Sequence, residues 1–131
     1  MNKNVYDIVV LLKACRFALE DERILQQEIF ERLEPFCTSK AFKLEREKRM
    51  DDKNIIDFMI TIPSIIDDFR IGIEVKLGAT QKRAIYRQCV RYCSFPQVID
   101  ELIMITNTSM GFPPEINGKS CYVLNLGKAW L

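Results

Sequence analysis

Hydrophobic residues recur at helical spacing in the first quarter of the chain. Apolar positions three, four or seven residues apart lie on one face of a helix, so amphipathic helices are expected here. The second such stretch, residues 22–33, places Leu25, Ile29 and Leu33 on one face, and Pro35 is expected to stop it. A joint between two helices is expected near residues 20–21. The first helix is carried by Val5, Ile8, Val9, Leu12 and Leu19.

Alternating apolar and polar positions follow, a pattern that is typical of β-strands. Residues 41–49 and 54–62 predict the two strands of a hairpin, because the polar residues 51–54 between them form a turn signal. A second turn around Pro63 leads to a third predicted strand over residues 71–77.

The rest of the chain alternates between helix and strand. Gly78 ends the third strand, and a helix is expected over about residues 80–95, where Pro96 ends it. Residues 102–106 form a nearly continuous apolar run, as expected of a strand covered on both faces, and residues 120–126 predict a last strand. A hairpin-joined set of strands followed by a helical crossover predicts an α/β fold, with a mixed central sheet flanked by helices.

The composition narrows the chemistry that the chain can perform. The 131 residues include no histidine, which excludes histidine-based nucleophilic triads and histidine-ligated zinc hydrolases. No repeat or long linker appears, so residues 1–131 are expected to form one domain. The net charge is only +1, so any attraction to nucleic acid has to come from local clusters of basic residues.

Cysteine content and hydropathy indicate a compartment. The longest apolar run near the start, residues 8–12, is closed by Lys13, so neither a signal peptide nor a membrane span is expected. The odd number of cysteines, five, favours reduced thiols in a cytoplasmic protein without a membrane partner. A structural zinc site is an alternative for Cys89 and Cys93, which lie one helical turn apart, but it needs other cysteines to converge on them.

Two acids and a lysine are the strongest candidates for chemistry. By the period of two, Glu74 and Lys76 share a face of the third strand. If the second and third strands pair, Asp57 and Glu74 meet beside Lys76, and such an oxygen-rich site suits Mg²⁺ or Mn²⁺. The alternative is that these are ordinary charges on a solvent-facing sheet. Asp57 is expected opposite an apolar face formed by Ile56, Phe58, Ile60 and Ile62.

Two helices add polar residues beside apolar stripes. Glu22 continues the stripe of Leu25, so its carboxylate is expected at the edge of the buried face, or else it is simply a favourable anion in a first helical turn. In the later helix Gln88 lies between Ile85 and Tyr92 on one stripe, so its amide needs a hydrogen-bond partner. The alternative is that the amide simply caps a backbone group of a strand.

The two acids and the lysine have a familiar spacing. Asp57, followed after sixteen intervening residues by Glu74-Val75-Lys76, resembles the signature of the PD-(D/E)XK nuclease superfamily, with Ile56 where the family name has proline. The segment Gln88-Cys-Val-Arg-Tyr92 resembles the Q-x-x-x-Y element of its RecB-like branch. The resemblance covers about residues 21–107 and implies the αβββαβ core of the restriction-endonuclease-like fold.

The resemblance also implies an activity, the metal-dependent hydrolysis of phosphodiester bonds in DNA. Asp57, Glu74 and the backbone carbonyl of Val75 would hold one or two Mg²⁺ or Mn²⁺ ions. Glu22 begins a segment similar to the first core helix, which supplies a further acid in many members, and would complete the coordination directly or through water. Lys76 would orient the attacking water or stabilise the transition state.

The helix after the third strand carries the remaining expectations. The resemblance implies that Gln88 and Tyr92 bind the phosphate backbone or brace the metal site. Residues 76–99 contain no Asp or Glu, so a basic face beside the acids predicts phosphate contacts, unless it is only a solvated helix face. Its members are Lys82, Arg83, Arg87 and Arg91.

The small size of the chain bears on its partners. The expected substrate is DNA, including branched DNA, or RNA. Because the chain is little longer than a catalytic core, recognition is expected to rest on backbone shape, on a partner or on a dimer. The protein would then act as a homodimer or as a subunit of a larger nuclease complex. Holliday-junction resolvases are the small dimeric members of the family. The alternative is a nuclease-like module without catalytic activity, which binds nucleic acid or protein.

Overall fold

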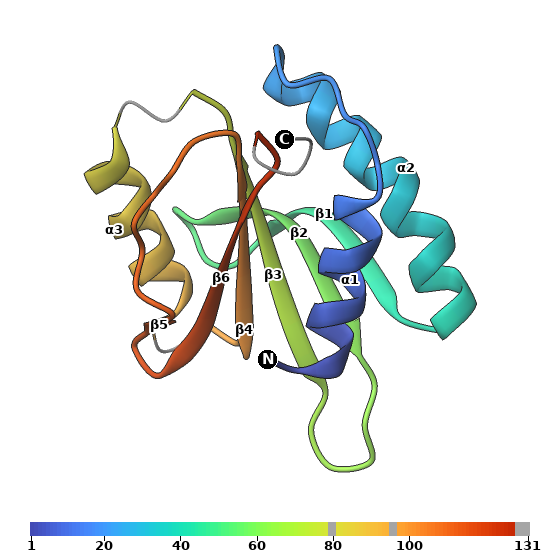
Figure 1. Ribbon diagram of the computed structural model, residues 1–131. Coiled ribbons are helices and arrows are strands. Elements are labelled where there is room, and N and C mark those ends of the chain that lie inside the picture. Colours follow the sequence, from blue (N-terminus) through green and yellow to red (C-terminus); the bar gives the residue numbers. More distant parts are fainter. Residues whose placement is uncertain (79–80, 95–96, 128–131) are drawn as a thin grey trace.

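The structure is a computed structural model that describes residues 1–78, 81–94 and 97–127 (Figure 1). Within these residues it contains three helices and six strands. The helices are α1 (Lys3–Lys13), α2 (Glu22–Lys40) and α3 (Lys82–Tyr92), and the strands are β1 (Lys43–Arg49), β2 (Ile55–Ile62), β3 (Phe69–Lys76), β4 (Glu101–Thr106), β5 (Glu115–Ile116) and β6 (Lys119–Asn125). The predicted ends of the third helix, Thr80 and Phe95, lie outside the described residues, as does Pro96.

The strands form one mixed sheet, in the order β1-β2-β3-β4-β6-β5. Strands β1, β2 and β3 are antiparallel neighbours, whereas β4 runs parallel to β3 and β6 runs parallel to β4. The crossover from β3 to β4 passes through α3. The predicted α/β class and mixed sheet are confirmed, and the short strand β5 is an element that the sequence pattern did not predict.

Helices cover both faces of the sheet. Helices α1 and α2 lie on one face and α3 lies on the other (Figure 1). The first apolar cluster joins α1 and α2 to the sheet through residues such as Leu25 and Ile73. The second cluster joins α3 to the opposite face through Ile85, Tyr92 and Met104. None of the described helices is long and apolar enough to cross a membrane.

The prediction that Pro35 stops the second helix was wrong, because α2 continues to Lys40. Proline removes one helical hydrogen bond, at a cost of about 3 kcal/mol or more in a helix interior. A further turn is nevertheless favourable here because Cys37 continues the buried face of Leu33. The helix ends instead at Ala41, whose left-handed backbone (φ 59°) turns the chain into β1.

The expected apolar face of β2 was wrong at one position. Phe58 and Ile60 lie in the cluster beneath α1 and α2, but Ile56 packs in the cluster beneath α3, together with Met59. The side-chain alternation of the strand therefore breaks at Asp57.

An irregular strand pairing accounts for this break. The register of β1 with β2 skips Glu47 and Asp57, and Glu47 has a positive φ of 47°. The pairing of β2 with β3 begins only at Phe58 and Ile73. The left-handed backbone of Glu47 thus interrupts the regular ladder opposite Asp57.

Candidate active site

Asp57 and Glu74 lie against each other where β2 and β3 cease to pair. The N–H of Asp57 donates to Oε1 of Glu74 at 3.3 Å, and the N–H of Val75 donates to Oδ2 of Asp57 at 2.7 Å. The two carboxyl groups thus accept hydrogen bonds that carbonyl oxygens would take in a regular ladder. The structure brings the two acids together, as the strand order predicted.

Burial changes the titration of both acids. Glu74 is only 2% exposed, and its pKa is raised from 4.5 to about 8, chiefly by loss of water and also by the charge of Asp57. Burial also raises the pKa of Asp57, although the N–H of Val75 and the charge of Lys76 oppose the rise. Two like charges in contact in a dry site do not both ionise readily, so the pair retains a proton near neutral pH.

Lys76 supplies the nearby positive charge. Its Nζ lies 3.7 Å from Oε2 of Glu74, and one third of its side chain is exposed. Its ammonium lowers the pKa of Glu74, but burial outweighs that effect. A pocket of about 450 Å³ lies beside Lys76, between the end of β3 and α3. The pocket is lined by Lys76, Leu77, Gly78, Gln81, Ala84, Ile85, Gln88 and Arg91.

Glu22 ties the first turn of α2 to the end of β3. Its Oε1 accepts a hydrogen bond from the N–H of Leu77 at 3.0 Å, and its charge contributes to the raised pKa of Asp57. The preceding residue, Asp21, caps the helix through the N–H groups of Arg23 and Ile24. Glu22 is therefore more than a favourable anion in a first turn, because it holds a helix and a strand together beside the acids.

Tyr92 and Gln88 form a hydrogen-bonded brace behind the acids. The Nε2 of Gln88 donates to the hydroxyl of Tyr92 at 2.7 Å, and that hydroxyl donates to the carbonyl of Ile55 at 2.7 Å. The hydroxyl also lies 3.4 Å from Oε1 of Glu74. Tyr92 is fully buried, so direct contact with a nucleic acid, one of its two implied roles, is not available to it in this structure. Its hydroxyl instead contacts the end of β2 and Glu74.

The basic residues of α3 form an exposed ridge beside the pocket. Arg83, Arg87 and Arg91 follow each other at helical spacing, and all three are exposed. Arg91 is the member nearest the acids, and its Nε donates to Oδ1 of Asn54 at 3.0 Å. None of the ion pairs found within the described residues involves Lys82 or the three arginines.

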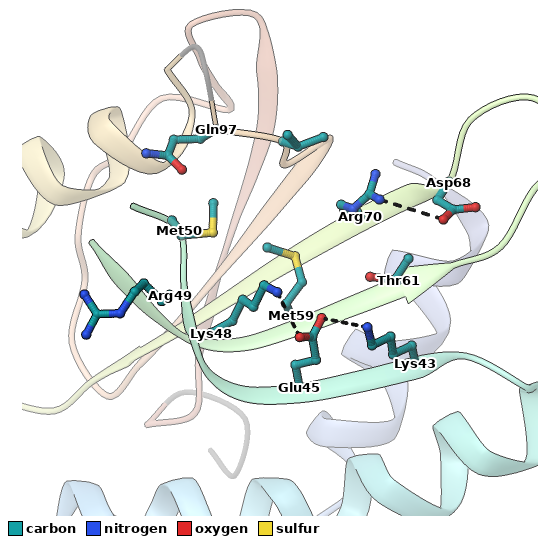
Figure 2. A pocket seen from close by; sticks show the side chains of 11 residues that line it. Lys43, Glu45, Lys48, Arg49, Met50, Met59, Thr61, Asp68, Arg70 and Gln97 are labelled. Atoms are coloured by element: carbon teal, nitrogen blue, oxygen red, sulfur yellow. Dashed lines mark ion pairs between the residues drawn. The ribbon is translucent and has the colours of Figure 1, made fainter. Parts of the chain in front are cut away.

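A second charged groove lies on the hairpin (Figure 2). It is on the same face of the sheet as α3, over the part that α3 does not cover. Glu45 lies between two lysines, 3.0 Å from Nζ of Lys48 and 3.8 Å from Nζ of Lys43, and Arg70 turns toward Asp68. This hairpin groove has a volume of about 340 Å³ and is lined by Lys43, Glu45, Lys48, Arg49, Met50, Met59, Thr61, Asp68, Arg70, Gln97 and Val98. Within the described residues most of its cations are therefore already paired with acids, unlike those of the arginine ridge.

The acid pair fits a divalent cation by its donor chemistry. Mg²⁺ is commonly held by one or two carboxylates and keeps several waters, and Asp57 and Glu74 offer two convergent carboxyl groups. The side chain of Val75 points into the opposite apolar cluster, so only its backbone can take part. Glu22 does not complete a set of three, since no group of three or more His, Cys, Asp or Glu residues in the described ranges is arranged to hold a metal ion.

The cysteines do not assemble a zinc site within the described residues. Cys89, Cys93 and Cys121 share the cluster beneath α3, and no disulfide joins any of the five cysteines in the part of the chain that the structure describes. Burial raises the pKa of Cys93 to about 11 and that of Cys121 to about 12, so both thiols are protonated at neutral pH.

Sequence reasoning missed two groups of residues near the site. Asn54 is a buried polar residue whose amide donates to both carboxylate oxygens of Asp51, while its oxygen accepts from Arg91. The signal was its place at the end of an Asp-rich turn. Tyr86 and Phe112 form a ring contact that depends on a turn-rich connection, and no local pattern marks it.

Comparisons with known protein families, curated proteins and solved structures give no match to this chain. A functional assignment therefore rests on the chemistry of the site.

Proposed function

We propose that the protein is a metal-dependent nuclease that hydrolyses phosphodiester bonds of DNA. The observation that carries the proposal is the buried contact between Asp57 and Glu74, with Lys76 beside it. Burying two acids against each other costs free energy and contributes little to a stable fold. Such a pair, with both pKa values raised, is typical of a functional site.

The arrangement of elements supports membership of the PD-(D/E)XK superfamily. Helix α2, the antiparallel strands β1 to β3, the crossover helix α3 and the parallel strand β4 follow one another in the order of the αβββαβ core. The acids lie on β2 and β3, and Gln88 and Tyr92 lie on the helix that follows. These are the positions that the restriction-endonuclease-like fold gives to the corresponding motif residues.

Each residue then has a chemical role. When bound by Asp57 and Glu74, Mg²⁺ or Mn²⁺ would supply a Lewis acid that activates water and offsets the charge of the phosphate. The ammonium of Lys76, held at the pocket mouth by Glu74, stabilises negative charge that develops on the phosphate. Tyr92 fixes the Glu74 carboxyl group from behind.

The arginine ridge of α3 favours a nucleic acid as the substrate. Exposed cations without acidic partners bind phosphates through charge and release counterions from the nucleic acid. Arg91 shares the pocket with Lys76, so phosphates bound along the ridge lead toward the acids.

A cleavage assay tests the proposal. Wild-type protein, Lys76→Ala and Asp57→Asn are incubated with linear duplex, single-stranded, flap and four-way-junction DNA, in Mg²⁺, in Mn²⁺ and in EDTA. We expect cleavage that requires the metal, and a loss of about 100-fold or more in either variant, because each removes a group that acts in the transition state.

The matched control is Lys3→Ala, which removes an exposed lysine from α1 and should cleave as wild type does. Retention of full activity by Lys76→Ala, on a substrate that the wild type cuts, would exclude its catalytic role. Metal-independent binding of DNA by wild type, without cleavage of any substrate, would instead favour a non-catalytic binding module.

A further inference from the structure

A groove lies between α3 and the connection from β4 to β5, two segments that run side by side in Figure 1. Its volume is about 530 Å³, and one wall comes from each segment. We call it the aromatic groove, and it is lined by Lys82, Arg83, Tyr86, Arg87, Met110, Gly111, Phe112 and Pro113.

Two aromatic rings form the apolar part of this groove. The rings of Tyr86 and Phe112 meet edge to face, with centroids 5.3 Å apart and an angle of 69° between their planes. Both side chains are half-buried, and Met110, which is 7% exposed, lies beside them. The groove therefore offers an apolar surface suited to a flat apolar or aromatic group.

The rim of the aromatic groove is positively charged. Lys82, Arg83 and Arg87 line it, and no acidic residue does. These three side chains have no ion pair in the parts of the chain that the structure describes. A ligand that suits both parts of the groove carries an aromatic group next to negative charge.

The aromatic groove and the pocket beside Lys76 lie on different sides of α3. Arg83 and Arg87 face the aromatic groove, whereas Gln88 and Arg91 line the pocket that also holds Lys76. The two hollows are thus separated by the width of one helix, about 10 Å. A single nucleic-acid strand that crosses α3 can reach both.

We propose that the aromatic groove holds an unpaired base of a single-stranded nucleic acid, while Arg83 and Arg87 bind the phosphates that flank it. This inference rests on the proposed function and specifies its substrate: a strand that is unpaired next to the position of cleavage. A base inside a duplex is stacked and paired, so it reaches such a groove only after unstacking at a cost of a few kcal/mol. Stacking on Tyr86 or Phe112 suits any base, so the preference is for strand form and not for sequence.

Fluorescence anisotropy in EDTA tests the proposal without cleavage. The probes are labelled (dT)₁₅, a duplex of the same length, and an abasic 15-mer that has the same phosphates but no bases. We expect wild type to bind (dT)₁₅ more tightly than either of the other probes. Removing the ring in Phe112→Ala should weaken binding of (dT)₁₅ by about 5- to 150-fold, because stacking of one base contributes about 1–3 kcal/mol. Binding of the abasic probe should be unchanged.

Two further variants separate stacking from folding. Phe112→Trp keeps an aromatic surface and should bind (dT)₁₅ at least as well as wild type, whereas Phe112→Leu keeps apolar bulk and should lose affinity as Phe112→Ala does. Tyr6→Ala, which removes an exposed aromatic side chain from α1, is the matched control and should behave as wild type. Circular dichroism confirms that each variant is folded.

The outcomes separate this inference from the proposed function. Equal affinity of wild type and Phe112→Ala for (dT)₁₅ overturns the proposal that the aromatic groove binds an unpaired base. A preference of wild type for duplex DNA overturns it as well. If DNA is cleaved in Mn²⁺ but Phe112 does not matter, only the groove assignment fails. If (dT)₁₅ binds in a Phe112-dependent manner but no DNA is cleaved, the groove binds a base and the nuclease proposal fails.

Discussion

Replacing Glu74 by glutamine should remove most of the pH dependence of stability between about pH 5 and 8. The pKa of Glu74 is raised from 4.5 to about 8 in the folded protein, chiefly by burial. The folded state therefore holds a proton that the unfolded chain has lost in this range. Stability supplied by the protonated group is complete below about pH 4.5 and is lost as the pH rises through 8.

The expected magnitude follows from proton linkage. When the folded state holds one proton that the unfolded state has lost, the free energy of unfolding falls by about 1.4 kcal/mol for each unit by which the pH rises. From pH 5.5 to 7.5 the loss is about 2 to 3 kcal/mol, which is a large part of the 5–15 kcal/mol typical of a small domain. The window is clear of histidine titration, because the chain contains no histidine.

Urea unfolding from pH 5.5 to 8, in EDTA, measures this effect. Glutamine resembles the protonated acid, so Glu74→Gln should match wild type near pH 5.5 and exceed its stability near pH 8. Glu34→Gln, which removes an exposed acid from α2, is the control for the loss of one negative charge. Parallel stability curves for wild type and Glu74→Gln would refute the idea that the folded protein holds this proton.

Three further predictions concern the ridge, the brace and α2. Replacing Arg83, Arg87 and Arg91 by alanine should make the slope of log affinity for duplex DNA against log salt less negative by about 2 to 3, since each phosphate contact contributes about −0.9. Removing the same number of positive charges from the hairpin groove should change the slope less. Tyr92→Phe should lower the free energy of urea unfolding by about 1–3 kcal/mol, because the carbonyl of Ile55 on β2 and the side-chain amide of Gln88 on α3 lose their partner. Pro35→Ala should raise that free energy by about 1–2 kcal/mol, because the helical hydrogen bond that it restores outweighs the greater freedom of the unfolded chain.

Local patterns predicted most of the fold. The hairpin of β1 and β2 followed from alternation and from the Asp-rich turn, whose Asp51 accepts the N–H groups of Lys53 and Asn54. Helix α3 followed from the apolar stripe of Ile85 and Tyr92. Strand β5 has two residues and depends on its partner β6, so no periodicity marks it. The continuation of α2 past its proline depends on tertiary packing, which outweighs local propensity.

The site was predictable in its residues and less so in its geometry. Strand parity brought Asp57 and Glu74 together, but it misplaced Ile56, because the irregular pairing at Glu47 interrupts the alternation. Helical spacing put Gln88 beside Tyr92, whereas the hydrogen bond of the Tyr92 hydroxyl to a strand carbonyl depends on tertiary structure. The aromatic groove joins two segments that are far apart in the sequence, so only the folded chain reveals it.

The most direct test of the metal site is a crystal structure of the protein grown near pH 8 and soaked in Mn²⁺. It requires no knowledge of the substrate, because the anomalous signal of manganese locates the ion. We predict an anomalous peak between the carboxyl groups of Asp57 and Glu74, which is absent from crystals of Asp57→Asn. A soaked wild-type crystal in which Mn²⁺ binds elsewhere, while the Asp57 N–H still donates to Glu74 and the pair holds no ion, would contradict the account.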